Sequence, residues 1–114
     1  MQNSEHFWSA LDQLVAENRV VIDRPKGSAH PRYPDLIYPH DYGYLEGTQA
    51  ADKGGIDVWR GSLGGMAVTG VIATVDLNKK DAEIKILIAC TPTEAQAILE
   101  LHNGGSQAAA LIWR

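Results

Sequence analysis

The 114-residue sequence predicts a single, mainly β domain with one helix near each end. Several short segments alternate apolar and polar residues between turns rich in Gly and Pro, which is typical of antiparallel strands. Helical periodicity occurs only near the two ends, at about residues 4–18 and 92–103. Strand and helix patterns do not alternate, and no repeat of 20 to 50 residues is present, so a parallel sheet is not expected. The sequence therefore predicts a small, mostly antiparallel barrel, closed or partly open, with five or so strands.

Composition sets limits on the class of protein. Hydrophobic residues make up 45% and charged residues 21% of the chain, as in ordinary globular domains. The net charge of −4 argues against a general nucleic-acid binder and implies that an anionic ligand would need metal cations. No apolar run approaches the roughly 20 residues of a membrane span, and the first residues lack a signal-peptide layout. We therefore expect a cytoplasmic location and no membrane partner. Cys90 is expected to be a buried small residue.

The first half of the chain contains a helix, a strand and an unusual loop. Residues 4–18 carry one apolar helix face, formed by Phe7, Leu11, Leu14 and Val15. A strand begins at Val20, and Pro25 ends it or places it at a sheet edge. The segment 25–39 holds four prolines, and Arg24, Lys26, His30 and Arg32 make this region cationic. Proline stiffening would reduce the entropy cost of holding these cations around an anion, although an ordinary solvated loop is the alternative.

The remaining strands are expected at about residues 42–45, 56–59, 66–75, 82–88 and 107–113, with a hairpin tip at 77–80. Gly70 is expected to bend the longest of these strands. Asp57 lies on the opposite face of its strand from its apolar neighbours, a position that calls for a functional reason. The clearest local signal is Thr91-Pro92-Thr93-Glu94, a capping box that starts a helix ended by the glycines at 104 and 105.

One aromatic run and one glycine-rich acidic loop carry a family resemblance. Tyr38-Pro39-His40-Asp41-Tyr42-Gly43-Tyr44 has the form Tyr-Pro-x-x-Tyr-Gly-Tyr, and Asp52-Lys53-Gly54-Gly55-Ile56-Asp57 resembles an Asp-Gly-Asp-Pro-x-Asp loop. Together they resemble the signature of the soluble, family I inorganic pyrophosphatases, over about residues 20–88. The resemblance implies a five-stranded OB-like barrel. It also implies Mg²⁺-dependent hydrolysis of inorganic pyrophosphate, or of a related small phosphoanhydride, by a metal-activated water.

The resemblance also implies roles for individual residues. Asp52, Asp57, Asp76 and Asp81 match metal-binding aspartates of the family, and Asp23 stands where a metal-associated glutamate is usual. Tyr38 and Tyr42 match active-site tyrosines, and Arg32 stands where a phosphate-binding lysine is usual. The phosphate-binding set is completed by Lys26 and Lys85. The expected catalytic residues are Asp57, Tyr42 and Arg32.

Several departures from the family pattern concern activity. Gly54 replaces the aspartate that helps to activate water in the family, with Asp41 and Glu46 as candidate replacements. Glu83 stands where a lysine is usual, with Lys85 further along the same face. The Tyr-Lys pair of the family's C-terminal helix is missing. The alternative to a hydrolase is therefore a catalytically weakened pyrophosphatase-like module that binds metal and a phosphorylated ligand.

Two further interpretations remain. A single-strand nucleic-acid binder on an OB-like barrel is a weaker alternative, because no basic stripe accompanies Trp8, Trp59 and Trp113. These tryptophans are better explained as core or subunit contacts. Family members are commonly oligomeric, so a homo-oligomer is an open alternative to a monomer. The histidines lack metal-ligand spacing, so no zinc site is expected.

Overall fold

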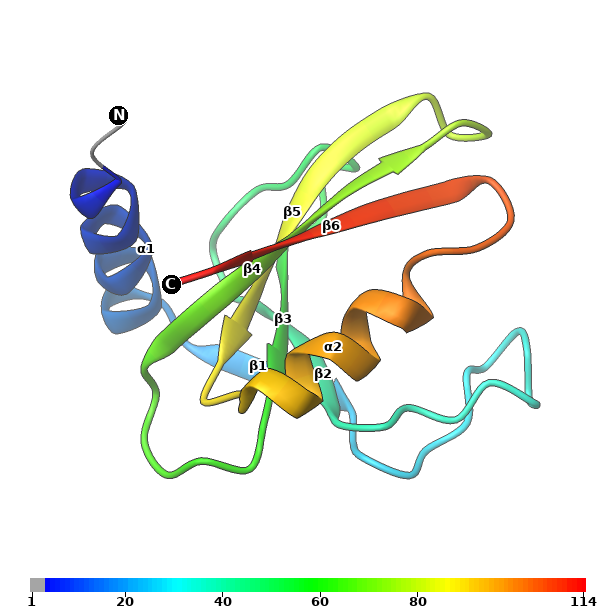
Figure 1. Cartoon of the computed structure of the whole chain (residues 1–114), viewed down its shortest axis with the longest axis horizontal. Coiled ribbons are helices and arrows are strands. Elements are labelled where there is room, and N and C mark those ends of the chain that lie inside the picture. The colour runs from blue at the N-terminus through cyan, green and yellow to red at the C-terminus, as the bar shows by residue number, and fades with distance from the viewer. Residues whose placement is uncertain (1–3) are drawn as a thin grey trace.

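A computed structural model describes residues 4–114 as one six-stranded sheet with two helices (Figure 1). The strands follow the order β1-β2-β3-β5-β4-β6 across the sheet. The elements, in chain order, are α1 (Glu5–Glu17), β1 (Val20–Arg24), β2 (Asp41–Leu45), β3 (Ile56–Arg60), β4 (Val68–Asp76), β5 (Asp81–Ile88), α2 (Pro92–Leu101) and β6 (Gln107–Trp113).

The mainly β fold with two flanking helices confirms the predicted fold class. Neighbouring strands pair antiparallel except β3 and β5, which pair in parallel. The sheet has six strands rather than five, because β6 pairs with β4 along seven residue positions, from Gly70 to Asp76. Within the described chain, β1 and β6 are the two outer strands of this order, so the sheet is open between them.

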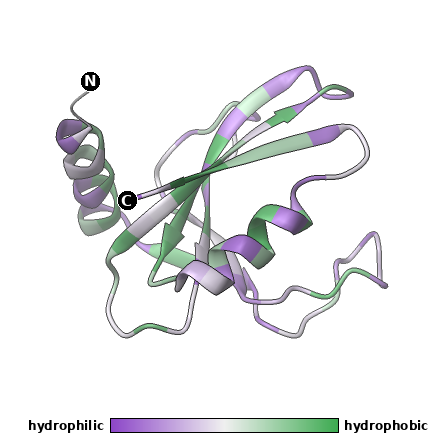
Figure 2. Ribbon diagram, in the orientation of Figure 1, coloured by the Kyte–Doolittle hydropathy of each residue, from purple (hydrophilic) through white to green (hydrophobic). Residues whose placement is uncertain are grey.

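The two helices cover opposite faces of the sheet. Side chains alternate between faces along a strand, so Ile86 and Ile88 of β5 join one apolar cluster and Leu87 joins another. The first cluster packs against Trp8, Leu11 and Val15 of α1, and the second packs against α2. Figure 2 shows hydrophobic residues where the central strands cross between the helices.

The N-terminal helix differs in one detail from the predicted apolar face. Leu11 and Val15 are buried as expected, but Phe7 is 40% exposed and Trp8 is buried in its place. The Phe7 and Trp8 rings meet edge to face at 5.2 Å. Trp8 and Trp59 are core residues, whereas Trp113 at the end of β6 is 42% exposed.

The close crossing of β1 and β2 depends on a glycine of the aromatic run. A Cβ atom added at Gly43 would lie 1.8 Å from the backbone oxygen of Val21. No side chain fits there without moving β1, so the Tyr-Gly-Tyr sequence has a structural requirement of its own. On β4 the register shifts between Val68 and Gly70, where the bend was predicted.

The C-terminal helix begins as the sequence predicts. The Thr91 side chain accepts a hydrogen bond from the Glu94 backbone N–H at 3.1 Å, and the Glu94 side chain accepts one from the Thr91 backbone N–H at 2.8 Å. Ala95 and Ile98 form its buried face. Neither helix in residues 4–114 has the length and apolar character needed to cross a membrane.

Candidate functional site

A polar cavity of about 300 Å³ opens on the face of the sheet that α2 only partly covers. The helix packs over the apolar half of this face, and beyond it the same face becomes polar. On β5 the change falls between Leu87, which packs under α2, and Lys85 and Glu83, which face the cavity. All six strands contribute to its lining: Asp23, Arg24, His30, Tyr38, Tyr42, Gly43, Tyr44, Asp52, Asp57, Thr74, Asp76, Lys79, Asp81, Glu83, Lys85 and Gln107.

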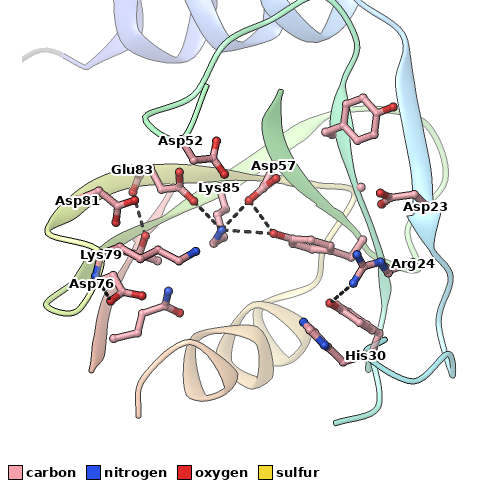
Figure 3. Close-up of a pocket in the computed structure, with 16 residues that line it drawn as sticks. Asp23, Arg24, His30, Asp52, Asp57, Asp76, Lys79, Asp81, Glu83 and Lys85 are labelled. Atoms are coloured by element: carbon pink, nitrogen blue, oxygen red, sulfur yellow. Dashed lines mark hydrogen bonds and ion pairs between the residues drawn. The ribbon is translucent and has the colours of Figure 1, made fainter. Parts of the chain in front are cut away.

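Lys85 lies at the centre of this cavity and joins residues of three strands (Figure 3). Its Nζ donates to Asp57 Oδ2 at 2.7 Å and to Glu83 Oε1 at 3.0 Å. It also donates to the Tyr42 hydroxyl at 3.3 Å, and that hydroxyl donates to Asp57 Oδ2 at 2.7 Å. The Lys85 side chain is only 6% exposed. One ammonium group therefore holds β2, β3 and β5 in register at the site.

The surroundings fix the protonation of Lys85 and Tyr42. Burial alone would lower the pKa of Lys85, but the Tyr42 and Asp57 oxygens and the hydrogen bond to Glu83 outweigh burial and raise it above its usual value. Burial raises the pKa of Tyr42, and the charge of Asp57 raises it further despite the opposing effect of Lys85. At neutral pH the site therefore holds a charged ammonium and a neutral phenol.

Glu83 has one carboxylate oxygen without a partner. Oε1 is bonded to Lys85, but Oε2 is buried and has no hydrogen-bond partner among the described residues. A buried oxygen without a partner is costly. Because Glu83 lines the cavity, this oxygen would gain a partner if the side chain turned towards something that enters the cavity.

The cavity lining carries an excess of negative charge. Six carboxylates face three cationic side chains, Arg24, Lys79 and Lys85. Figure 3 shows Asp52, Asp81 and Glu83 on one side of Lys85 and Arg24 and Asp23 on the other. Hydrogen bonds from the backbone N–H of Lys79 and Asn78 and from the Ser106 hydroxyl lower the pKa of Asp76, so this carboxylate stays ionised.

The carboxylates do not form a ready-made metal cluster. Within residues 4–114, no group of three His, Cys, Asp or Glu side chains converges closely enough to hold an ion. Mg²⁺, however, usually binds through one or two carboxylates, several waters and the oxygens of a bound phosphate. The acidic lining and the unpartnered Glu83 oxygen fit an ion that enters together with a phosphate ligand.

The cationic side of the cavity is built on β1 and the loop that follows. Arg24 Nη1 donates to the Tyr38 hydroxyl at 3.2 Å, and its guanidinium lies 5.9 Å from the centre of the Tyr38 ring. The bond holds the guanidinium beside Tyr38, and both residues line the cavity. Arg24 presents further donors in a planar fork suited to phosphate oxygens.

Eight of the ten residues singled out from the sequence line the cavity: Asp23, Tyr38, Tyr42, Asp52, Asp57, Asp76, Asp81 and Lys85. Lys26 and Arg32 do not line it. Both are exposed in the proline-rich loop, where the Lys26 backbone N–H bonds to Asp41 and the Arg32 backbone N–H bonds to His30. Asp41 and Glu46 are also outside the cavity, and Glu46 pairs with Arg19 at 2.9 Å.

Lys79 and Glu83 also line the cavity, and sequence analysis gave neither a role in the site. Glu83 and Lys85 are two residues apart on a strand whose other face is apolar, and this alternation was a usable signal for a polar face. Arg24 was grouped with the cations of the proline-rich loop without a specific role, and the structure places it at the end of β1, where it lines the cavity and bonds to Tyr38.

Comparison with solved structures finds this fold in bacterial inorganic pyrophosphatases. A pyrophosphatase from Neisseria gonorrhoeae has a TM-score of 0.60 and 19% identity, covering 82% of this chain and 80% of its own. One from Coxiella burnetii has a TM-score of 0.59 and 14% identity, covering 83% of each chain. One from Helicobacter pylori has a TM-score of 0.57 and 14% identity, covering 82% of this chain and 81% of its own. No protein-family model and no curated protein sequence matches the chain. At these identities the likeness establishes a pyrophosphatase-like fold.

Proposed function

We propose that this protein hydrolyses inorganic pyrophosphate, or a closely related small phosphoanhydride, with Mg²⁺. The observation that carries the proposal is the acidic cavity centred on Lys85, to which all six strands contribute. Its support is the pyrophosphatase-like fold together with the motif residues Tyr42, Asp52 and Asp57, which line the same cavity.

The charge of the cavity explains why a divalent ion is needed. Six carboxylates against three cations repel a highly charged anion unless cations enter with it. Asp52, Asp57, Asp76, Asp81 and Asp23 are the residues that would hold Mg²⁺. When bound, Mg²⁺ neutralises phosphate charge and lowers the pKa of a coordinated water.

The basic and phenolic groups would bind the phosphates. Lys85 and Lys79 lie on the β5 side of the cavity and Arg24 on the β1 side, so they can contact opposite ends of a short anion. The neutral Tyr42 hydroxyl can donate to a phosphate oxygen by exchanging its bond to Asp57. Held between these groups, the anhydride would be fixed in one orientation, and such positioning is, with electrostatic stabilisation, a main contribution of a protein to phosphoryl transfer.

Glu83 is the residue that we propose accepts a proton from the attacking water. In the reaction the water oxygen bonds to one phosphorus atom as the bridging P–O bond breaks, and the leaving phosphate keeps the bridging oxygen. The water proton passes to the Glu83 carboxylate and then to the leaving phosphate. Glu83 lines the cavity and has one carboxylate oxygen without a partner among the described residues, whereas Asp41 and Glu46 lie outside the cavity.

A specific observation also favours the second candidate, a binding module without turnover. Lys85 Nζ forms an ion pair with Asp57 Oδ2 at 2.7 Å, so this carboxylate already has a cationic partner. Gly54 stands in the acidic loop where the family pattern has its middle carboxylate. A ligand that could not displace Lys85 from Asp57 would bind without being hydrolysed.

The test is phosphate release from inorganic pyrophosphate with and without Mg²⁺. We expect Mg²⁺-dependent release that Asp57→Asn abolishes and Asp81→Asn reduces by about 10²-fold or more. Among the described residues the Asp81 carboxylate makes no hydrogen bond or ion pair that the substitution would break, whereas Asp57 bonds to Tyr42 and Lys85, so Asp81→Asn separates a site effect from misfolding. Asp35→Asn, at an exposed loop position outside the cavity, is the matched control.

The two candidates give different results with Gly54→Asp. A Cβ atom at Gly54 would meet only the flexible Asp52 side chain, at 3.3 Å, so the variant should fold. Release by the parent protein identifies a hydrolase. No release by the parent, with release gained by Gly54→Asp, identifies a binding module that lost its nucleophile activation. No release by either protein, with no pyrophosphate bound, would contradict both.

A further inference from the structure

A second cavity, of about 330 Å³, adjoins the polar one and has a different character. It lies between the 28–40 loop and the end of α2. The two cavities share five lining residues: His30, Tyr38, Tyr42, Lys85 and Gln107. The residues unique to the second cavity are Tyr33, Leu36, Trp59, Leu101 and His102. The two cavities are therefore adjacent, and a ligand held at Lys85 lies beside the second one.

The walls of the second cavity are largely aromatic. The His30 and Tyr38 rings are nearly parallel, with an interplanar angle of 12° and centroids 6.1 Å apart, and Tyr38 and Tyr42 stack at 5.4 Å. The Trp59 ring centroid lies 4.6 Å from that of Tyr42 and 5.8 Å from that of Tyr38. Trp59 is fully buried and forms the floor, whereas Tyr33 at the rim is 59% exposed. A lining of stacked aromatic rings, with the exposed Tyr33 ring at the opening, suits a flat aromatic ligand.

Beside Trp59, a hydrogen-bonded chain of polar groups formed by Trp59, His102 and Gln107 lines the second cavity. Trp59 Nε1–H donates to His102 Nε2 at 3.0 Å, which leaves His102 Nδ1–H to donate to Gln107 Oε1 at 2.9 Å. Burial lowers the pKa of His102 and keeps its ring neutral. The Gln107 side-chain nitrogen has no hydrogen-bond partner among the described residues. It can donate to a ring nitrogen or carbonyl of a guest.

We propose that the preferred ligand is a nucleoside di- or triphosphate, with its phosphates at Lys85 and its base among the aromatic rings of the second cavity. This inference rests on the proposed function and names the substrate class of the same site. Inorganic pyrophosphate would leave the aromatic cavity empty. An alkyl diphosphate would bury the Gln107 donor without a partner, which is unfavourable. A heteroaromatic base can both stack on the aromatic rings and accept a hydrogen bond from the Gln107 side-chain nitrogen.

The size of the cavities agrees with this ligand class. Each cavity alone is at the lower limit of about 300–1,000 Å³ for small-molecule sites. Side by side, they offer one acidic compartment for phosphate with its cations and one aromatic compartment for a base.

The test compares binding of nucleoside 5′-(β,γ-imido)triphosphates with binding of imidodiphosphate, in Mg²⁺, by calorimetry. Imidodiphosphate presents the same phosphate end without a nucleoside. We expect at least one nucleotide to bind about tenfold or more tightly than imidodiphosphate.

Tyr33→Ala should weaken nucleotide binding about five- to tenfold and leave imidodiphosphate binding unchanged. Leu101→Trp, which fills the aromatic cavity, should act in the same direction. Phe7→Ala removes an exposed ring outside both cavities and is the control.

The Trp59 indole N–H provides a readout independent of affinity. Because it is hydrogen-bonded to His102, its NMR signal should shift when nucleotide binds and stay in place with imidodiphosphate. Equal affinities for the two ligand types, or nucleotide binding that neither Tyr33→Ala nor Leu101→Trp changes, would overturn the inference while leaving the proposed function intact. Binding of neither ligand type would overturn both.

Discussion

Lys85 is buried at the point where the polar cavity meets the apolar core under α2. Burying an ammonium group is costly, and here Asp57, Glu83 and Tyr42 together offset that cost. The arrangement makes Lys85 both a phosphate-binding candidate and a structural bridge between strands. A substitution at Lys85 would therefore change binding and stability together, which makes Glu83 the more informative residue to vary.

Replacing Glu83 by Gln should separate chemistry from binding. The amide oxygen can still accept the bond from Lys85, but the side chain can no longer accept a proton from water. We expect kcat for pyrophosphate to fall about 10²- to 10⁴-fold, while the Kd for imidodiphosphate stays within a few-fold. Glu100→Gln, at an exposed position on α2, is the matched control. An unchanged kcat for Glu83→Gln would assign the proton acceptor to another group.

At the residue scale, sequence identified the acidic residues better than the basic ones. Asp52 and Asp57 belong to a short motif around a tight loop, so their neighbours in sequence are also neighbours in space. Lys26 and Arg32 were assigned from a proline-rich loop whose path depends on long-range contacts, such as the bond from the His30 N–H to the Leu36 oxygen. The cation that lines the site from this region, Arg24, belongs to β1 instead.

Among the helices and strands, the start of α2 is the best predicted feature, because its capping box lies within four consecutive residues. Its capping box is completed by Glu94, which also accepts a bond from the Ser62 N–H at 3.1 Å. Burial alone would raise the pKa of Glu94, but the hydrogen bonds from Thr91 and Ser62 bring it down to about 2. One carboxylate thus ties the helix start to the loop after β3.

This lowered pKa predicts how Glu94→Gln changes stability with pH. The carboxylate is favoured by folding, so its contribution is complete above its usual pKa of 4.5 and disappears as pH falls towards about 2. We expect Glu94→Gln to lower the free energy of unfolding by about 1 kcal/mol at pH 7, and by much less at pH 2, in urea titrations. A difference that stays constant across this range would show that the charge of Glu94 is not involved.

The sequence predicted where the strands lie along the chain better than it predicted their order in the sheet. Alternation located β4, β5 and β6 within a few residues, because it depends only on which side chains face the core. The parallel pairing of β3 with β5 and the addition of β6 beside β4 join segments far apart in the chain. No local pattern specifies those partners. The lack of strand–helix alternation predicted only a mostly antiparallel, barrel-like arrangement, which the family resemblance also implied.

At the scale of the whole molecule, the site exists because the two helices cover the sheet unequally. In Figure 1, α1 lies at one end and α2 crosses part of the other face, so the rest of that face is free to carry charged side chains. The aromatic second cavity was not predicted, because its walls come from the 28–40 loop, the end of α2 and four strands, β2, β3, β5 and β6. Their meeting depends on the complete fold.

On the function proposed here, a phosphoanhydride and its divalent ions bind in the acidic cavity around Lys85. The most direct test is a crystal structure with imidodiphosphate and Mn²⁺, whose anomalous scattering locates the metal independently of the phosphate. We predict both in the cavity, with phosphate oxygens in contact with Lys85 or Arg24 and the metal beside the Asp52 or Asp81 carboxylate. An empty cavity at millimolar ligand, or ligand bound on another surface, would contradict this account.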